Sequence, residues 1–169
     1  WSSVVVLERG SARAEWLVLG GLAVAVGTAA VAVLPSLHRE SLESACVANL
    51  RNLGRFVEHY SKRNARNCPD TTGRAFLNDL LEERHGFERI ESKNWLCPYA
   101  YPAGDAAEPY RGPAAPLPAE PAPGAILACD PPGLHPDGSI NVLTFDGIVR
   151  TVRPDDPKYG EILKGTVGR

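Results

Sequence analysis

The sequence lacks the motifs that usually mark a catalytic or locally built metal site. It contains no GxSxG elbow and no glycine-rich loop that would cradle a phosphate. Neither a CxxC pair nor an HxxxH helix is present, so one local turn cannot supply a set of zinc ligands. The histidines occur singly, without a neighbouring nucleophile in a known spacing. We therefore predict that the chain is not an enzyme, and no local motif commits it to a metal or cofactor.

A strong charge of one sign is also missing. The chain has 18 basic and 20 acidic residues, which gives a formal net charge of -2. No cluster of lysine and arginine interleaves with aromatic residues, which make up only 7% of the sequence. A surface that tracks phosphates needs both features. We expect no nucleic-acid partner.

What the chain does have is an uncharged apolar run over residues 16–34. As a helix this run would be roughly 28 Å long, close to the thickness of the hydrocarbon core of a bilayer. Its three glycines would weaken a helix in water but are tolerated in membrane helices. We predict a leader over residues 1–10 and a transmembrane anchor helix over 11–34. A cleaved secretory signal and a buried core helix are the alternatives.

After the apolar run, residues 35–64 predict an amphipathic stalk helix. Pro35 lacks a backbone N–H and should kink or locally break the helix where the anchor ends. Apolar residues then recur at spacings of three and four, which places them on one helical face. They are Leu42, Cys46, Leu50, Leu53, Val57 and Tyr60. Gly54 on this helix indicates either the close approach of another backbone or a tolerated weak spot.

Residues 65–169 predict a small α+β head. A short helix should bury Phe76, Leu77, Leu80 and Leu81, and a proline-rich loop over 102–124 should run along the surface. A strand over 126–130 and a hairpin of 139–145 with 148–152 follow, and Asp146-Gly147 forms the turn. The predicted fold is α+β, with a long N-terminal helix and a small antiparallel sheet.

Four cysteines occur, and their number is even. In an extracytoplasmic domain they can pair as disulfides in three ways, and the sequence does not choose among them. They are Cys46, Cys68, Cys97 and Cys129.

The start of the chain carries a family resemblance. Gly10, Ser11 and Glu15 match the pattern G-xxxx-E before an apolar helix. This pattern resembles the prepilin-type leader of type IV pilins and type II secretion pseudopilins. The resemblance implies that prepilin peptidase cuts after Gly10, and that the new amine of Ser11 meets the Glu15 carboxylate of a neighbouring subunit.

Two further segments strengthen the resemblance. The stalk resembles the C-x-x-NL-x-x-LG-xxxxxY segment of pseudopilin-like proteins, and residues 135–147 resemble the H-x(9)-DG element of a prepilin-like family of planctomycete-type bacteria. Ten residues rather than nine separate the histidine from the aspartate here. The matching positions are Cys46, Asn49, Leu50, Leu53, Gly54, Tyr60, His135, Gly138, Asn141, Val142, Leu143, Asp146 and Gly147. Residues 94–98 (NWLCP) and 110–113 (YRGP) look like the middle region of that family.

The resemblance implies a pilin-like fold and a structural role. The chain would be a subunit of a type II secretion or type IV pilus-like filament, single-pass in the inner membrane, with its C-terminal head outside the cytoplasm. Its partners would be other pilin-like subunits, prepilin peptidase and membrane lipid. The alternative is a signal-anchored extracytoplasmic binding domain that never polymerises. Arg13 favours this alternative because the family has an apolar residue there.

Calcium is a weak candidate cofactor on the same grounds. Major type II pseudopilins bind calcium in a loop of their C-terminal sheet, and this chain has oxygen donors around its predicted hairpin. Calcium takes six to eight oxygen ligands. The candidates are Asp137, Asn141 and Asp146, with Asp130 nearby.

Overall fold

The computed structural model describes the backbone of residues 11–65, 67–82, 96–106 and 108–168. Side chains are described for residues 34–65, 67–80, 96–103 and 108–168. The chain divides into two compact units, Trp1–Ser41 and Leu42–Arg169. The predicted leader, with Gly10, lies outside the described residues. Ser11 and Glu15 lie in the first helix, but their side chains are also outside the description.

The first helix, α1 (Ser11–Arg63), is a continuous α-helix that contains Pro35. Of the two effects predicted for this proline, a kink or a local break, the break is therefore not present, since α1 runs without interruption from Ser11 to Arg63. In the part of the chain that the structure describes, no helix has both the length and the apolar character needed to cross a membrane. Most side chains of the predicted anchor over residues 11–34 lie outside that part.

The second unit packs the last part of α1 against a small sheet. The structure confirms the mixed helical and antiparallel fold class, while the pilin-like likeness stays a prediction. The elements after α1 are α2 (Gly73–Glu82), the 3-10 helix η2 (Pro98–Ala106), β1 (Gly112–Pro113), β2 (Ile126–Cys129), β3 (Ile140–Thr144), β4 (Val149–Val152), α3 (Lys158–Lys164) and β5 (Thr166–Val167).

The main sheet is antiparallel, with the strand order β2-β3-β4. The predicted hairpin is confirmed, since β3 pairs with β4 and Leu143 lies opposite Val149. At the turn, the N–H of Gly147 donates to the carbonyl of Thr144 at 2.9 Å. Gly147 has φ +76°, a conformation that favours glycine. A second, two-stranded sheet pairs β1 with β5.

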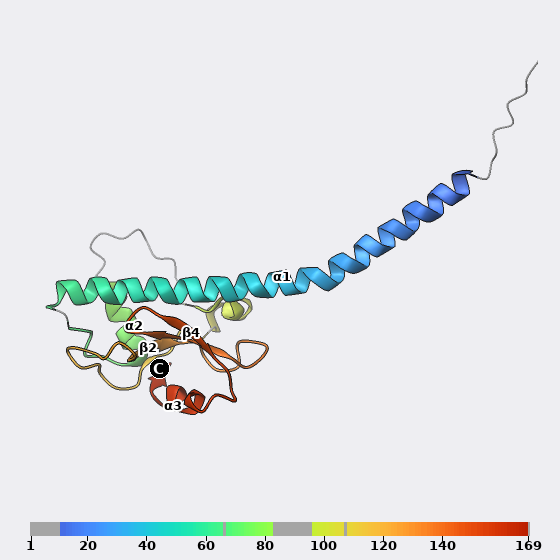
Figure 1. The fold of residues 1–169 in the computed structure, drawn as a ribbon. Helices are drawn as coiled ribbons and strands as arrows, with labels where there is room; N and C mark the ends of the chain where they lie inside the picture. The colour runs from blue at the N-terminus through green and yellow to red at the C-terminus, as the bar shows by residue number, and fades with distance from the viewer. Residues whose placement is uncertain (1–10, 66, 83–95, 107, 169) are drawn as a thin grey trace, which may run out of the picture. The chain divides into compact units, whose positions relative to one another are not determined.

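The central strand β3 is buried on both faces. Leu143 belongs to the core cluster that includes the buried residues of α1. Ile140 and Val142 instead pack with Ile162 of α3 in a second cluster. Figure 1 shows the sheet between the end of α1 and α3. Helix α3 thus covers the face of the sheet that is opposite α1.

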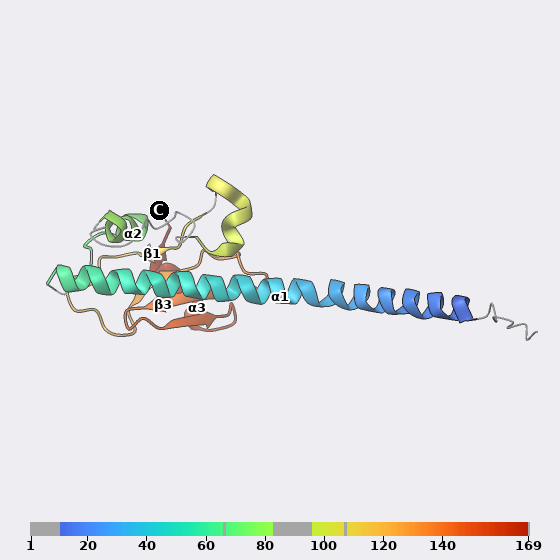
Figure 2. The same ribbon diagram turned by 90° about the horizontal axis from the view of Figure 1, so that it is seen from above.

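The predicted apolar stripe of the stalk is confirmed. Cys46, Leu50, Leu53 and Val57 are each at most 2% exposed. Figure 2, the view from above, shows this part of α1 crossing over β3 with α2 beside it. A Cβ added at Gly54 would lie 3.3 Å from a terminal methyl of Leu143. The glycine therefore does mark a close approach, and the approaching segment is the β3–β4 hairpin.

The segment predicted as a proline-rich surface loop, residues 102–124, is only partly exposed. It contains the end of η2 and all of β1. Tyr110 within it is fully buried, among the core residues of α1 and the sheet. The sequence does not reveal that this segment contributes to the core. Its strand β1 is only two residues long, and the strand that pairs with it, β5, lies near the C-terminus.

Gly112 allows α2 and β1 to approach each other. A Cβ at this position would collide with the carbonyl oxygen of Gly73, which is backbone and cannot move aside alone. We predict that Gly112→Ala lowers the free energy of unfolding by about 1–3 kcal/mol, as overpacking does. Thermal and urea unfolding would measure the loss. Gly124→Ala is the matched control because its Cβ would meet nothing within 4 Å, and an equal loss in both variants would contradict the assignment.

Candidate metal centre

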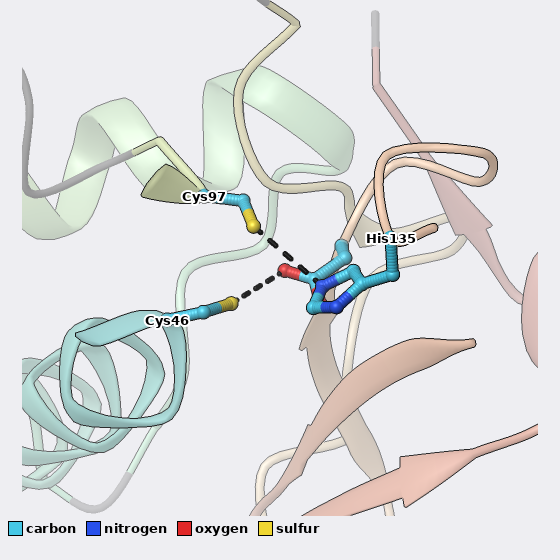
Figure 3. A group of neighbouring side chains, drawn as sticks. Cys46, Cys97 and His135 are labelled. Atoms are coloured by element: carbon cyan, nitrogen blue, oxygen red, sulfur yellow. Dashed lines mark hydrogen bonds and ion pairs between the residues drawn. The ribbon is translucent and has the colours of Figure 1, made fainter. Parts of the chain in front are cut away.

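Four buried side chains with metal-binding atoms meet inside the second unit. Cys46, Cys97, Asp130 and His135 each offer one such atom, and these atoms all lie within 4.8 Å of one another. Each of the four residues is at most 4% exposed. Figure 3 shows the Cys97 sulfur facing the imidazole of His135, while the Cys46 sulfur faces a carboxylate oxygen beside that ring. We call this group the Cys–Asp–His cluster.

Helix α1 and the segment before η2 supply the two cysteines. Cys46 belongs to the buried stripe of α1, so the packing of that helix orients its thiol toward the sheet. Cys97 directly precedes η2, and the Asn49 side chain of α1 donates to the carbonyl of its neighbour Leu96 at 3.2 Å. The motif asparagine thus holds the Cys97 segment against the helix that carries Cys46.

The segment between β2 and β3 supplies the other two residues. Asp130 follows β2, and its Oδ2 accepts the backbone N–H of Asn141, on β3, at 2.8 Å. His135 starts a turn in which its carbonyl accepts the N–H of Gly138 at 2.9 Å. Gly138 has φ +74°, which favours glycine at this position. The turn brings the histidine ring back over the end of the sheet.

The contacts within the cluster are short. His135 Nε2 lies 2.8 Å from Asp130 Oδ2 and 3.6 Å from Cys97 Sγ. The Cys46 thiol donates to Asp130 Oδ1 at 3.0 Å. The carboxylate therefore bridges the histidine and the helix thiol, and Nε2 is the ring atom that faces the other donors.

The protonation of the cluster follows from its burial and its partners. Burial lowers the pKa of His135, but the hydrogen bond and the charge of Asp130 outweigh it and raise this pKa to about 10. The pKa of Cys46 is raised by its hydrogen bond with Cys97 and by burial. Without a cation, the cluster therefore holds a neutral Cys46 thiol and a protonated His135 that lies 2.8 Å from a carboxyl oxygen of Asp130.

Asn141 forms a second layer around the cluster. Its Oδ1 accepts the Thr151 hydroxyl at 2.7 Å, which orients the amide. Its Nδ2 then lies 3.5 Å from both Cys46 Sγ and His135 Nε2. The Tyr110 hydroxyl lies 3.6 Å from the same sulfur. The Asn141 amide donates to the sulfur from outside the cluster, and a donor of this kind stabilises a metal-bound thiolate.

All four cysteines are free thiols in the structure. The possible disulfide pairings predicted from their even number are therefore not formed here. Cys129 bonds instead with the Thr166 hydroxyl at 3.2 Å, and Cys68 is buried elsewhere in the core. Of the four cysteines, Cys46 and Cys97 belong to the cluster, and their sulfur atoms lie within 4.8 Å of each other.

The calcium candidates do not converge. Asp137 is exposed and accepts the N–H and hydroxyl of Ser139, and Asp146 is exposed at the hairpin turn. They lie beyond opposite ends of β3, whose five residues span roughly 17 Å. Asp130 belongs to the Cys–Asp–His cluster instead, and Asn141 lies beside that cluster. Nothing in this arrangement identifies calcium.

Local spacing does not reveal the metal-binding group of this chain. Its four residues come from a helix, the residue before η2 and the β2–β3 segment, so no single turn holds two of the cysteine and histidine ligands. In the sequence, Cys97 is a disulfide candidate within the NWLCP motif, and Asp130 is an oxygen donor near the predicted hairpin. A usable signal was present, because Cys97 lies in the NWLCP motif and Cys46 and His135 begin the other two.

The remaining motif positions have structural places. Leu50 is fully buried in the core, and Tyr60 packs against it half-buried. Asp146 accepts the Thr144 hydroxyl within the hairpin turn that Gly147 closes. These positions shape the helix-to-sheet packing and are not part of the cluster.

Comparison with family models, curated protein sequences and solved structures finds no match for this chain.

Asp130 should be important for stability even without a metal. Removing one partner of a buried ion pair costs about 3–5 kcal/mol, because the other charge stays buried. We predict this loss for Asp130→Ala, measured by urea unfolding with a chelator present. Asp155→Ala, at an exposed position, should change stability by less than about 0.5 kcal/mol. A loss below about 1 kcal/mol for Asp130→Ala would contradict the ion pair.

Proposed function

We propose that this chain is a pilin-like structural subunit of a type II secretion or type IV pilus-like filament. It is anchored in the inner membrane by the apolar run of residues 16–34, and its head lies outside the cytoplasm. Prepilin peptidase processes it after Gly10. Its lasting partners are other pilin-like subunits and membrane lipid.

One observation carries this proposal: the stalk motif and the C-terminal motif form a single interface. The space beside Gly54 is closed by Leu143 and by the backbone of Gly147. Asn141 reaches Cys46 at the other end of the same interface. Residues that match the family pattern are thus in contact although they are far apart in sequence. Contact of this kind supports a shared architecture rather than chance similarity in two separate segments.

The helix itself supports an assembly role. At 1.5 Å per residue, the 53 residues of α1 extend for roughly 80 Å, far more than a small domain needs for its core. Leu34 and Leu37 on α1 are 61% and 55% exposed. Neighbouring exposed leucines on a helix are suited to contact with lipid or with another helix, as larger apolar patches are. In this proposal, lipid covers these side chains before assembly, and helices of neighbouring subunits cover them in the filament.

Glu15 is the residue proposed to direct assembly. A lone carboxylate in an apolar helix bundle is costly unless it is paired. The amine of Ser11 in a neighbouring processed subunit would provide the opposite charge. The pair would set the register between adjacent anchor helices.

A second candidate is the non-polymerising binding domain, and a surface groove favours it. The groove has a volume of about 410 Å³ and lies between the end of α1 and the loop after β1. Val57, Ser61, Pro121 and Phe145 line it together with Glu58, Lys62, Ala119 and Glu120. Its mixed polar and apolar lining suits a small polar ligand or a peptide side chain.

Processing is the first test. In cells that contain prepilin peptidase, we predict that the mature chain begins at Ser11, because cleavage follows Gly10. Mass spectrometry of the amino-terminal peptide would identify the end. The Gly10→Val variant is the control and should retain its leader. A wild-type chain that keeps residues upstream of Gly10 would favour the non-polymerising candidate.

Assembly is the second test. We predict that Glu15→Ala reduces recovery in sheared or cross-linked filaments at least about tenfold, which corresponds to a lost interaction of about 1.4 kcal/mol per subunit. Glu40→Ala is the matched control on an exposed position of the same helix. Equal recovery of Glu15→Ala and wild type, with both present in the membrane, would remove the role given to Glu15.

A further inference from the structure

We propose that the Cys–Asp–His cluster binds one Zn²⁺ ion as a structural centre that ties α1 to the sheet. The four ligands are Cys46 Sγ, Cys97 Sγ, His135 Nε2 and one carboxylate oxygen of Asp130. This proposal is independent of filament assembly, since it concerns only the second unit.

The donor atoms select the metal. Two sulfurs, one imidazole nitrogen and one carboxylate oxygen form a mixed set that suits zinc in tetrahedral coordination. Calcium and magnesium bind oxygen, and only one residue of the four offers it. The cluster is therefore selective against the calcium that the family resemblance implies.

The distances suit a tetrahedral ion. Zinc bonds of about 2.3 Å to sulfur and about 2.0–2.1 Å to nitrogen or oxygen place a sulfur and a nitrogen about 3.6 Å apart across a tetrahedron. The observed distance from Cys97 Sγ to His135 Nε2 is 3.6 Å. The two contacts of Asp130 involve different oxygens, since Oδ2 lies 2.8 Å from His135 Nε2 and Oδ1 lies 3.0 Å from Cys46 Sγ. With Oδ1 as the zinc ligand, its distance to Cys46 Sγ would open by about half an ångström. Side-chain rotation alone can supply a shift of this size.

The site is closed, which indicates a structural role. Structural zinc sites have four protein ligands, whereas catalytic sites keep one position for water or substrate. Here all four ligands are buried, so a bound ion would have no open position facing solvent. The ion would replace the two thiol protons and the imidazolium proton, which pass to solvent.

Groups around the cluster suit the bound form. The Asn141 amide points at Cys46 Sγ, and the backbone N–H of Asn141 donates to the carboxylate of Asp130. Such outer partners hold metal ligands in position, and their loss typically costs 10–100-fold in metal affinity. Asn141 is thus assigned as a positioning residue for the zinc ligands.

The first experiment measures the metal in the wild-type full chain, purified under reducing conditions. After incubation with Zn²⁺ and dialysis, we expect about one zinc per chain by elemental analysis, and millimolar Ca²⁺ should not displace it. X-ray absorption should show two sulfurs at about 2.3 Å and two lighter atoms at about 2.0–2.1 Å. This measurement needs no variant, so a folding defect cannot obscure it.

Cobalt and variants locate the site. Co²⁺ in place of zinc should give the absorption of a tetrahedral ion with a thiolate-to-metal band. Cys46→Ser and Cys97→Ser should each weaken binding by more than about 100-fold, and Asn141→Leu by about 10–100-fold. Cys129→Ser and Cys68→Ser are the matched controls, since both residues are buried cysteines outside the cluster. They should bind as the wild type does.

Three results would overturn the proposal. The first is that the reduced wild-type chain binds no zinc by elemental analysis. The second is that X-ray absorption shows only nitrogen and oxygen ligands around the zinc. The third is a Cys46–Cys97 disulfide, found by non-reducing peptide mapping in most of the chain as it is isolated without reductant. In that case the two thiols serve as a covalent link, and the cluster has no zinc function.

Discussion

The packing of one face of α1 onto β3 is the interaction on which the rest of the second unit depends. Leu50, Leu53 and Val57 cover the sheet, and burying each such side chain contributes about 1.5–3 kcal/mol. Gly54 allows the hairpin to come close enough for this packing. On the other face of the sheet, Ile162 of α3 closes a second, smaller core. Every described strand is positioned, directly or through a neighbour, by this layered arrangement.

The Cys–Asp–His cluster lies at one end of this apolar interface. Burying its polar groups there lowers stability unless each of them has a hydrogen-bond partner. Asp130 meets the need by accepting from His135, from Cys46 and from the backbone of Asn141. A divalent cation would satisfy the same atoms more completely, since it replaces weak thiol donors by metal bonds. The cluster thus connects helix, loop and sheet at a point where apolar contacts alone would not specify their register.

The proposed filament role and the proposed zinc centre complement each other. A subunit that is drawn from a membrane into a filament needs a head that stays attached to its stalk. The Cys–Asp–His cluster joins Cys46 of the stalk helix to residues before η2 and after β2. A metal ion bound at this position would hold the head to the helix without enlarging the small hydrophobic core.

The sequence by itself determined the elements whose signals are local, namely α1, α2, β2 and the β3–β4 hairpin. Spacings of three and four predicted the buried stripe of α1, and Asp146-Gly147 predicted the hairpin turn. Only the tertiary structure decided three features that depend on contacts between distant residues. It placed Tyr110 in the core, it covered the second face of β3 with α3, and it brought Cys46, Cys97, Asp130 and His135 together. No local pattern encodes these contacts, since the chain must first fold around β3 to create them.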